Sequence, residues 1–473
     1  MYQNKKIIKR LGTLITIFAC CLFLVAPAQA LTPNDPLIAN QWYLDQINAY
    51  GAWDISTGSN TVVVAVLDTG LDLDHPDIAG NLWTNPGEIA GDGIDNDDNG
   101  FIDDVHGWDF VDDNGDPSPD YSEEYALPGI LHGTLIASVI GAVGNNGEGV
   151  AGLNWQVQLM PIRILDGLGS GSSGDATRAI DYAVANGATV INSSFSGFEA
   201  DNSLLQALRR AHNNGVTVVA AVGNNESLGG DWLDEVPIYP ACYHDETGSD
   251  WVIGVAATDK FDNKAGFSNY GSCVDISAPG SDIYGAQFYE PSQVEFNQEY
   301  GGGWEGTSAA APMVAGTAAL LEVMYPDLGP SEIQTVIKLS ADPVAIGTDY
   351  AGLMGSGRLN VAKALEIGAS FVESAITASS EPESEPSVET DKSLEEQALV
   401  YFGAFYGRMP ESADDWAALH CIAYGGCQGD PRDIEAEQAA LVIFGAKYAK
   451  MPEISMEWNV IHTLAYTDFL TVE

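Results

Sequence analysis

The sequence predicts an α/β domain whose parallel sheet is flanked by helices, and two observations support this prediction. Between about residues 35 and 367, apolar runs of strand length alternate with amphipathic stretches of helical spacing. The apolar runs are nearly continuous, which is typical of parallel strands buried on both faces. Farther along the chain, an internal repeat predicts a small all-α C-terminal module.

The strands and helices follow from local patterns. Buried strands are predicted over five apolar runs, at 61–68, 157–165, 188–195, 215–222 and 250–257. Helices are predicted over 176–187 and 203–215, because each stretch has helical spacing and ends in glycine. Two more helices are expected to begin at His132 and Ser308. In the second, the alanines after Ser308 favour helix, and Pro312 is expected in the first turn, where proline is tolerated.

Residues 1–30 are predicted to be a secretory signal peptide. Four cations precede the apolar run 11–25, and Ala28-Gln29-Ala30 has the small-x-small pattern of a cleavage site. The run is short for a membrane span, and no later stretch is expected to be one. The sequence therefore predicts a secreted or periplasmic protein without stable membrane insertion.

The C-terminal part contains the repeat. Residues 398–410 (ALVYFGAFYGRMP) are matched by 440–452 (ALVIFGAKYAKMP), 42 positions later. Two helices per repeat predict a helical module over 395–473, separated from the α/β domain (31–367) by an acidic Ser/Glu/Pro linker over 368–394. The module could bind an unknown partner, retain the protein at a surface, or be trimmed off. Its histidines and cysteines could hold a metal, but repeated residues at helical spacing are more often packing residues.

Charge and cysteine content narrow the class of protein. The net charge is −49, and loss of the signal peptide, with four cations and no anion, makes it −53. Such acidity argues against nucleic acid or an anionic membrane as a partner. It is compatible with calcium, cationic partners or a salty medium, and alone it does not choose among them. Four cysteines remain after residue 30, which suggests two disulfides of three possible connectivities. Proximity favours Cys242 with Cys273 and Cys421 with Cys427.

Three residues far apart in the sequence are candidates for nucleophilic catalysis. Asp68 ends a predicted strand, and His132 and Ser308 begin predicted helices. A reactive serine needs a base within hydrogen-bond reach and a carboxylate that orients the base. It also needs donors for the developing oxyanion, for which Asn224 and the N–H of Ser308 are candidates. Small neighbours around Ser308, in GTSAAAPMVAG, leave room for a substrate carbonyl.

The chain resembles the subtilisin-like serine proteases, or subtilases, over residues 35–367, roughly 70% of its length. The motifs on which this resemblance rests are VVVAVLDTGLDLDHPDI around Asp68, HGTLIASVIGA around His132, AAVGNN around Asn224 and GTSAAAPMVAG around Ser308. The order Asp, His, Ser along the chain is the order known in that family. The resemblance implies a subtilisin-like fold, and it implies a serine endopeptidase that acts on proteins or peptides. A catalytically silent subtilase-fold binding protein is the alternative.

Two further segments resemble the substrate-pairing edges of the family. The implied substrate-binding residues are Gly169, Ser170 and Gly171 on one edge and Ser194, Phe195 and Ser196 on the other. The chain departs from the family at Leu135, where a second histidine is usual, and at Ser196, where glycine is usual. Ser196 is expected to narrow or polarise the mouth of the pocket. The sequence after residue 30 leaves no room for an N-terminal inhibitory pro-domain, so we expect unaided folding with calcium or assistance from the C-terminal module.

Two calcium sites are predicted. In DNDDNGFIDD, oxygen-bearing residues at alternate positions precede a glycine, as in the first half of an EF-hand loop. Asp95, Asp97 and Asn99 are the expected ligands, and Asp103 or Asp104 is expected to replace the missing bidentate glutamate. The alternative is a solvated acidic turn without an ion. The family resemblance implies a second site at Asp77 and Asn146.

Overall fold

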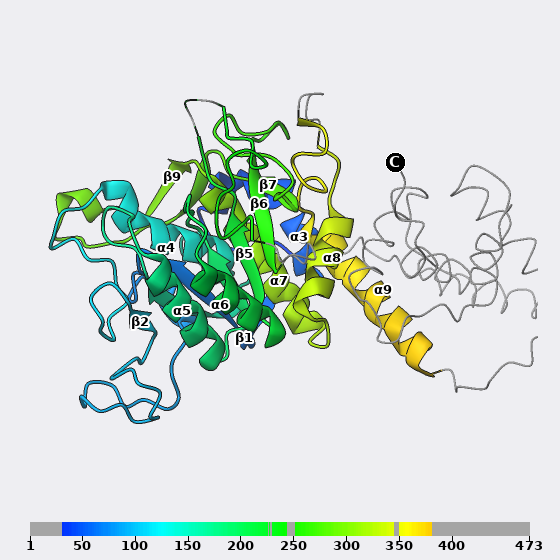
Figure 1. Cartoon of the computed structure of the whole chain (residues 1–473). Helices are drawn as coiled ribbons and strands as arrows, with labels where there is room; N and C mark the ends of the chain where they lie inside the picture. Colours follow the sequence, from blue (N-terminus) through cyan, green and yellow to red (C-terminus); the bar gives the residue numbers. More distant parts are fainter. Residues whose placement is uncertain (1–30, 226, 228, 244–250, 345–349, 381–473) are drawn as a thin grey trace, which may run out of the picture.

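The structure is a computed structural model that describes residues 31–225, 227, 229–243, 251–344 and 350–380 (Figure 1). These residues cover most of the α/β domain and the first residues after it. The predictions of a signal peptide, a helical repeat module and a second disulfide at Cys421 and Cys427 lie outside the described residues.

A seven-stranded parallel sheet runs through the domain in the order β2-β3-β1-β4-β5-β6-β7. Its strands are β1 (Gly58–Asp68), β2 (Trp108–Asp109), β3 (Gln156–Arg163), β4 (Val190–Ser193), β5 (Thr217–Ala221), β6 (Val252–Thr258) and β7 (Ile276–Pro279). All five predicted strands are present, as β1, β3, β4, β5 and β6. The sequence did not predict β2 and β7, nor the small antiparallel pair β8 (Ile283–Ala286) and β9 (Tyr300–Trp304).

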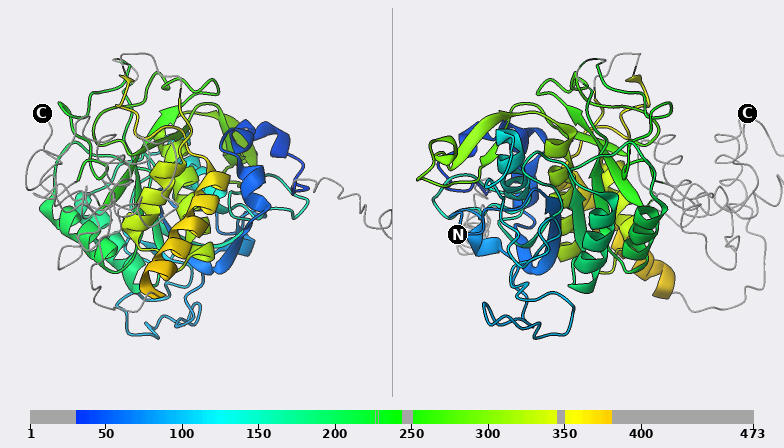
Figure 2. Two further views of the ribbon diagram at one scale, coloured as in Figure 1. Left: turned by 90° about the vertical axis from the view of Figure 1, so that its right-hand side faces the viewer. Right: turned by 60° about the vertical axis from the view of Figure 1, so that its left-hand side comes forward.

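Helices cover both faces of the sheet (Figures 1 and 2). One face packs against α4 (Leu127–Gly141) and α7 (Thr307–Met324), and the other against α5 (Ser173–Ala185) and α6 (Asn202–Asn213). Along β1, Val64 and Val66 belong to the first of these cores, whereas Val63, Ala65 and Leu67 belong to the second. This division explains the continuous apolar run, because successive side chains point to opposite faces and both faces are buried.

Shorter elements complete the domain. The remaining helices are α2 (Trp42–Gln46), α3 (Ala49–Trp53), α8 (Pro330–Ser340) and α9 (Val361–Ser380), with 3-10 turns η1 (Ile38–Asn40), η2 (Ala79–Asn81) and η3 (Val294–Phe296). Helix α9 continues past residue 368, where the linker was expected to begin. The start of that segment contains alanine and other helix-compatible residues, so it extends the helix.

Three other expectations differ from the structure. His132 lies in the second turn of α4, because that helix begins five residues earlier with Leu127-Pro128. Pro312 lies inside α7 beyond its first turn. Helix α7 is also long and apolar enough to cross a membrane, although no later span was expected; 78% of it is buried, so it is a core helix of the domain.

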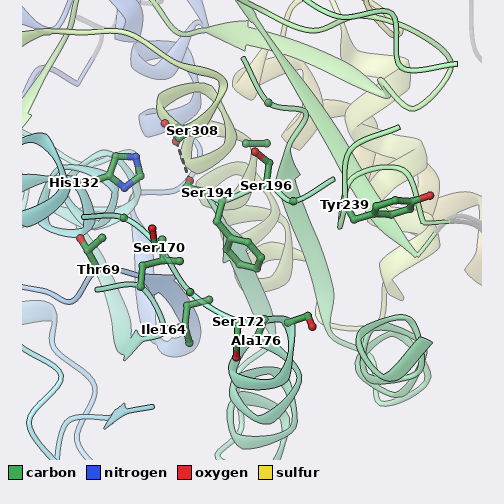
Figure 3. Close-up of a pocket in the computed structure, with 18 of the residues that line it drawn as sticks. Thr69, His132, Ile164, Ser170, Ser172, Ala176, Ser194, Ser196, Tyr239 and Ser308 are labelled. Atoms are coloured by element: carbon green, nitrogen blue, oxygen red, sulfur yellow. Dashed lines mark hydrogen bonds between the residues drawn. The ribbon is translucent and has the colours of Figure 1, made fainter. Parts of the chain in front are cut away.

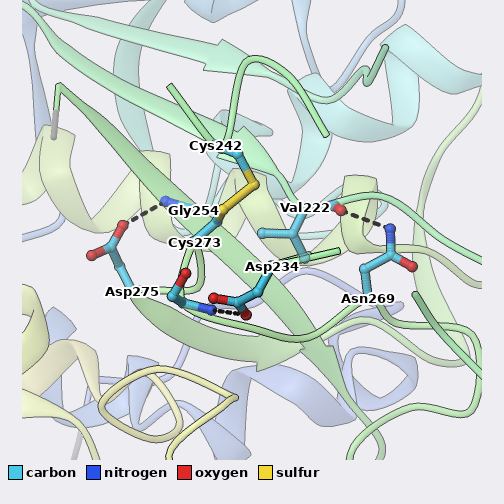
Figure 4. The surroundings of a disulfide bond; sticks show 8 residues. Val222, Asp234, Cys242, Gly254, Asn269, Cys273 and Asp275 are labelled. Carbon is cyan, nitrogen blue, oxygen red and sulfur yellow. Dashed lines mark hydrogen bonds between the residues drawn. A yellow bond between two sulfur atoms is a disulfide. The ribbon is translucent and has the colours of Figure 1, made fainter. Parts of the chain in front are cut away.

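The predicted disulfide between Cys242 and Cys273 is present (Figure 4). It joins the segment before β6 to the segment before β7 across a sequence separation of 31 residues. Cys242 is buried in the core that also contains α5 and α6. The bond therefore ties two neighbouring strands at one side of the sheet.

Candidate active site

The candidate site is a cavity of about 580 Å³ at the carboxyl ends of the central strands. Strands β1, β4 and β5 are neighbours in the sheet, so the residues that come after them meet at one edge. The lining includes nine predicted site residues, namely His132, Gly169, Ser170, Gly171, Ser194, Phe195, Ser196, Asn224 and Ser308. Figure 3 shows His132 and Ser308 at one end of this cavity.

Asp68 and His132 are joined by a short hydrogen bond. The Nδ1 of His132 lies 2.7 Å from Oδ1 of Asp68, whose side chain is fully buried. The same oxygen accepts from the Thr69 N–H at 2.8 Å, and the Thr69 hydroxyl in turn accepts from the N–H of Gly133 in α4. The end of β1 therefore sets both the position of α4 and the orientation of the imidazole. With Nδ1 donating to Asp68, Nε2 is the free acceptor of the neutral ring.

The environment of His132 favours its protonated form. Burial alone would lower the pKa of His132, but the charge of Asp68 and its hydrogen bond outweigh burial, so the pKa is raised above its usual 6.5. An imidazolium formed at this position is therefore stabilised by a buried carboxylate. This electrostatic arrangement suits a general base that must carry a proton for part of a reaction.

Ser308 is the second residue of α7, and its main-chain carbonyl is held from outside the helix. Proline at position 312 has no N–H to donate to the carbonyl four residues earlier, which is that of Ser308. The hydroxyl of Ser194 donates to this carbonyl instead, at 2.9 Å (Figure 3). The interior proline therefore links the start of α7 to the segment after β4.

Asn224 faces the start of the same helix. Its Oδ1 accepts from the N–H of Thr307 at 2.9 Å and from the Thr307 hydroxyl at 3.2 Å, which leaves Nδ2 as a free donor group. A Cβ added to Gly306 would lie 2.8 Å from Oγ of Ser308 and 3.6 Å from Nδ2 of Asn224. Both polar atoms therefore border one small space, which only glycine at 306 keeps open.

The two predicted substrate edges line the cavity. Residues 169–171 and 194–196 both contribute to its walls. A Cβ added to Gly223 would lie 3.5 Å from the Ser196 hydroxyl, so this hydroxyl faces the segment that precedes Asn224. Sequence reasoning did not predict the other lining residues, among them Ala176 in α5, Leu204 in α6, Glu199 in the loop before α6 and Tyr239 in the loop before β6. No local motif marks these four, because packing of the helices and loops brings them to the cavity.

The acidic loop brings only some of its predicted ligands together. Carboxylate oxygens of Asp95, Asp97 and Glu88 lie within 4.8 Å of one another, and sequence reasoning did not predict Glu88. The Asn99 side chain lies beside this group, donating to Asp97 at 3.2 Å. Three carboxylates at such distances form a set of hard oxygen donors that suits a divalent cation.

Of the other two predicted ligands of this loop, Asp103 has separate partners, whereas Asp104 contacts the group through Asn99, whose Nδ2 donates to it at 3.1 Å. Asp103 accepts from the N–H groups of residues 91–93 and so closes a neighbouring turn. Asp104 is buried and accepts from the Tyr182 hydroxyl at 2.7 Å and from Asn85 at 2.9 Å. Glu88, which precedes the motif, is thus the carboxylate that lies beside Asp95 and Asp97, where Asp103 or Asp104 was expected.

Asp77 and Asn146 are in contact, as the second predicted site requires. Nδ2 of Asn146 donates to Asp77 at 2.7 Å, and the Val150 N–H donates to the other carboxylate oxygen at 2.8 Å. Burial raises the pKa of Asp77 to about 6, and the charge of Asp35, which sequence reasoning missed, adds to the rise. Two buried carboxylates without a cationic side chain fit a bound cation, because its charge would stabilise both.

Comparison with known proteins places these features in a family. Residues 59–369 match the model of the subtilase family. Thermitase from Thermoactinomyces vulgaris is 36% identical over 337 residues, covering 71% of this chain and 99% of thermitase. An extracellular protease from Xanthomonas campestris pv. campestris is 35% identical over 351 residues, covering 70% of this chain and 56% of that protein.

A solved structure has the same fold. It is described as proteases from Pseudoalteromonas arctica, and it aligns with a TM-score of 0.57 and 30% sequence identity. The alignment covers 72% of this chain and all of the other. The part of the chain that aligns with these proteins is the part that contains the sheet, the cavity and its flanking helices.

Proposed function

We propose that this chain, which belongs to the subtilase family and is a serine-type endopeptidase, cleaves peptide bonds with Ser308 as nucleophile, His132 as general base and Asp68 as the carboxylate that orients it. The observation that supports these roles best is the 2.7 Å hydrogen bond between buried Asp68 and His132, in a cavity that Ser308 also lines. A structural ion pair alone would not require the other side of the histidine to face an open cavity.

The proposed reaction has two halves, acylation of Ser308 and hydrolysis of the acyl-enzyme, and each catalytic group acts once in each half. His132 Nε2 takes the proton of Ser308 Oγ, which attacks the substrate carbonyl. Asn224 Nδ2 and the Ser308 N–H stabilise the oxyanion. The Ser308 N–H can do so because N–H groups in the first turn of a helix have no carbonyl partner within the helix. His132 then gives the proton to the leaving amine. Water attacks the acyl-enzyme by the same route, and Ser308 is regenerated.

The substrate is an extended peptide held between the two edges of the cavity. Segments 169–171 and 194–196 both line the cavity, and strand-like pairing with their main chain would not demand one sequence. Calcium would be held by Asp77, Asn146 and carbonyls near them, and by Glu88, Asp95 and Asp97, and its charge would stabilise these loops. Export is supported by the predicted signal peptide and by a relative that is named as extracellular.

Labelling with a fluorophosphonate probe tests the catalytic roles. Ser308 Oγ would displace fluoride from phosphorus, so intact mass should show one adduct on the wild type and none on Ser308→Ala. His132→Ala should label at least a hundredfold more slowly, because the serine then lacks its base. An unlabelled but folded wild-type protein, or labelling that persists in Ser308→Ala, would contradict the proposal.

A further inference from the structure

Lys264 carries a charge that main-chain carbonyls surround. Its Nζ donates to the carbonyl oxygens of Gly229 at 2.8 Å, Ala265 at 3.0 Å and Ser268 at 2.7 Å. An ammonium has three N–H donors, so these bonds use all of them in the charged form, which is the main form below the pKa of about 8 to which burial lowers Lys264. The carbonyls come from two different segments, one after β5 and one after β6, and Lys264 therefore joins them.

Two aromatic rings complete the surroundings of the ammonium. The ring centroids of Tyr270 and Tyr350 lie 5.5 Å and 5.0 Å from Nζ, within the range of cation–π attraction. Within the described part of the chain, Lys264 forms no ion pair with a carboxylate. The site is tight, because a Cβ added to Gly230 would lie 3.0 Å from Nζ and 1.9 Å from the Ser268 carbonyl oxygen.

The segment that Lys264 holds is also the one that supports Asn224. Asn224 pairs with Ser268 in an antiparallel bridge, and the next residue along, Asn225, donates its N–H to the Phe267 carbonyl at 2.8 Å. The Asn269 side chain donates to the Val222 carbonyl at 3.0 Å (Figure 4). The main chain on both sides of Asn224 therefore lies against residues 267–269.

We propose that Lys264 is a positioning residue for the oxyanion donor: its ammonium fixes the 265–270 segment, and that segment sets the place of Asn224. The inference rests on the proposed role of Asn224 in catalysis. Thr307 orients the Asn224 amide from one side, and the segment held by Lys264 fixes its main chain from the other.

Kinetics of a matched set of variants test this role. Lys264→Met keeps the length of the side chain and removes its donors and charge. We expect kcat on a peptide substrate to fall at least about tenfold while KM stays within about twofold, because an oxyanion donor acts on the transition state more than on bound substrate. Lys260→Met is the control, since Lys260 is exposed on the same turn and contacts only the Phe261 ring in the described structure. It should retain wild-type kcat.

The dependence on Asn224 separates positioning from general stabilisation. In an Asn224→Ala background, Lys264→Met should lower kcat by less than about twofold, because the group that it positions is gone. If Lys264→Met does not accumulate as folded protein, Lys264→Gln takes its place; its shorter amide keeps two N–H donors, so a smaller loss of kcat is expected, again only when Asn224 is present. An equal loss in both backgrounds, or an unchanged kcat in the first, would overturn the inference. If the proposed function itself were wrong, the result would be different, because the wild-type protein would then not cleave the peptide substrate.

Discussion

His132 is the residue whose protonation should control activity on the acid side. Catalysis requires the neutral ring, and Asp68 raises the pKa of His132 above 6.5 despite burial. Activity should therefore be full at higher pH and fall as the pH drops through a midpoint above 6.5. The dependence of kcat/KM on pH measures this midpoint in the free enzyme. A midpoint below 6.5 would contradict the assigned environment of the ring.

The variant Asp68→Asn is the control for that profile. It removes the charge that raises the pKa of His132, so any residual activity should have an acid midpoint below that of the wild type. Activity should also fall by about 10⁴, because the amide no longer holds the required tautomer. A lowered rate with an unmoved midpoint would assign the shift to another group.

For single residues, sequence motifs predicted the proposed catalytic residues, but they did not predict the residues that tertiary packing brings to a site. Asp68, His132, Asn224 and Ser308 were predicted because each stands in a short segment of recognisable residue types, and all of them border or support one cavity. Glu88 was not predicted, because its carboxylate joins Asp95 and Asp97 through the path of a loop. A local sequence pattern contains no information about contacts that depend on the path of a loop.

Helix α7 and the segment after β4 are joined by a contact that arises from a proline. Pro312 leaves the Ser308 carbonyl without a helical partner, and the Ser194 hydroxyl donates to it at 2.9 Å. Ser194→Ala should lower the free energy of unfolding by about 1 kcal/mol, since the partly buried Ser308 carbonyl loses its donor. Urea unfolding in the inactive Ser308→Ala background measures this loss without self-digestion, and the main-chain carbonyl is unchanged there.

The compensating variant Pro312→Ala tests the cause of that loss. Alanine at 312 provides the missing N–H, so the helix itself can satisfy the carbonyl, and the cost of Ser194→Ala should shrink to the part due to Asn192, whose Nδ2 donates to the same hydroxyl at 2.9 Å. If Ser194→Ala costs the same with either residue at 312, the hydroxyl stabilises something other than this carbonyl.

Elements with a strong local period were predicted, and those that depend on tertiary pairing were not. The long apolar strands and the amphipathic helices α5 and α6 all appear near their expected positions. Strand β2 has two residues and β7 ends in a proline, so neither has enough length for a pattern. The start of α4 was misplaced because Leu127-Pro128 begins the helix without a side-chain cap.

For the molecule as a whole, the proposed calcium sites predict that stability depends on calcium. Asp77 and Asp35 are buried near each other, and Glu88, Asp95 and Asp97 form a second acidic group. Removal of bound cations should lower the melting temperature, since at a hundredfold excess over Kd a ligand contributes about 2.7 kcal/mol. Calorimetry of the Ser308→Ala variant in excess EGTA, with calcium-saturated EGTA as control, measures the change.

Single substitutions separate the two acidic groups. Asp77→Asn should reduce the response to EGTA through the first site, and Asp95→Asn through the second, because each removes one charged ligand. An unchanged melting temperature of the parent in EGTA would contradict calcium binding at both. If the change in melting temperature caused by EGTA is the same in both variants as in the parent, residues other than these bind the cation.

The order in which the cavity is assembled has a consequence for the timing of activity. Asp68 ends the first strand of the sheet, whereas Ser308 begins a helix that comes after the last strand of that sheet. A chain still emerging from the ribosome can hold the carboxylate and the base for many residues before it has a nucleophile. Even a fully synthesised chain has no nucleophile in place until α7 has packed against strands that formed much earlier. If Ser308 is the nucleophile as proposed, an incomplete chain could not cleave peptides, and cleavage would begin only after this helix had packed.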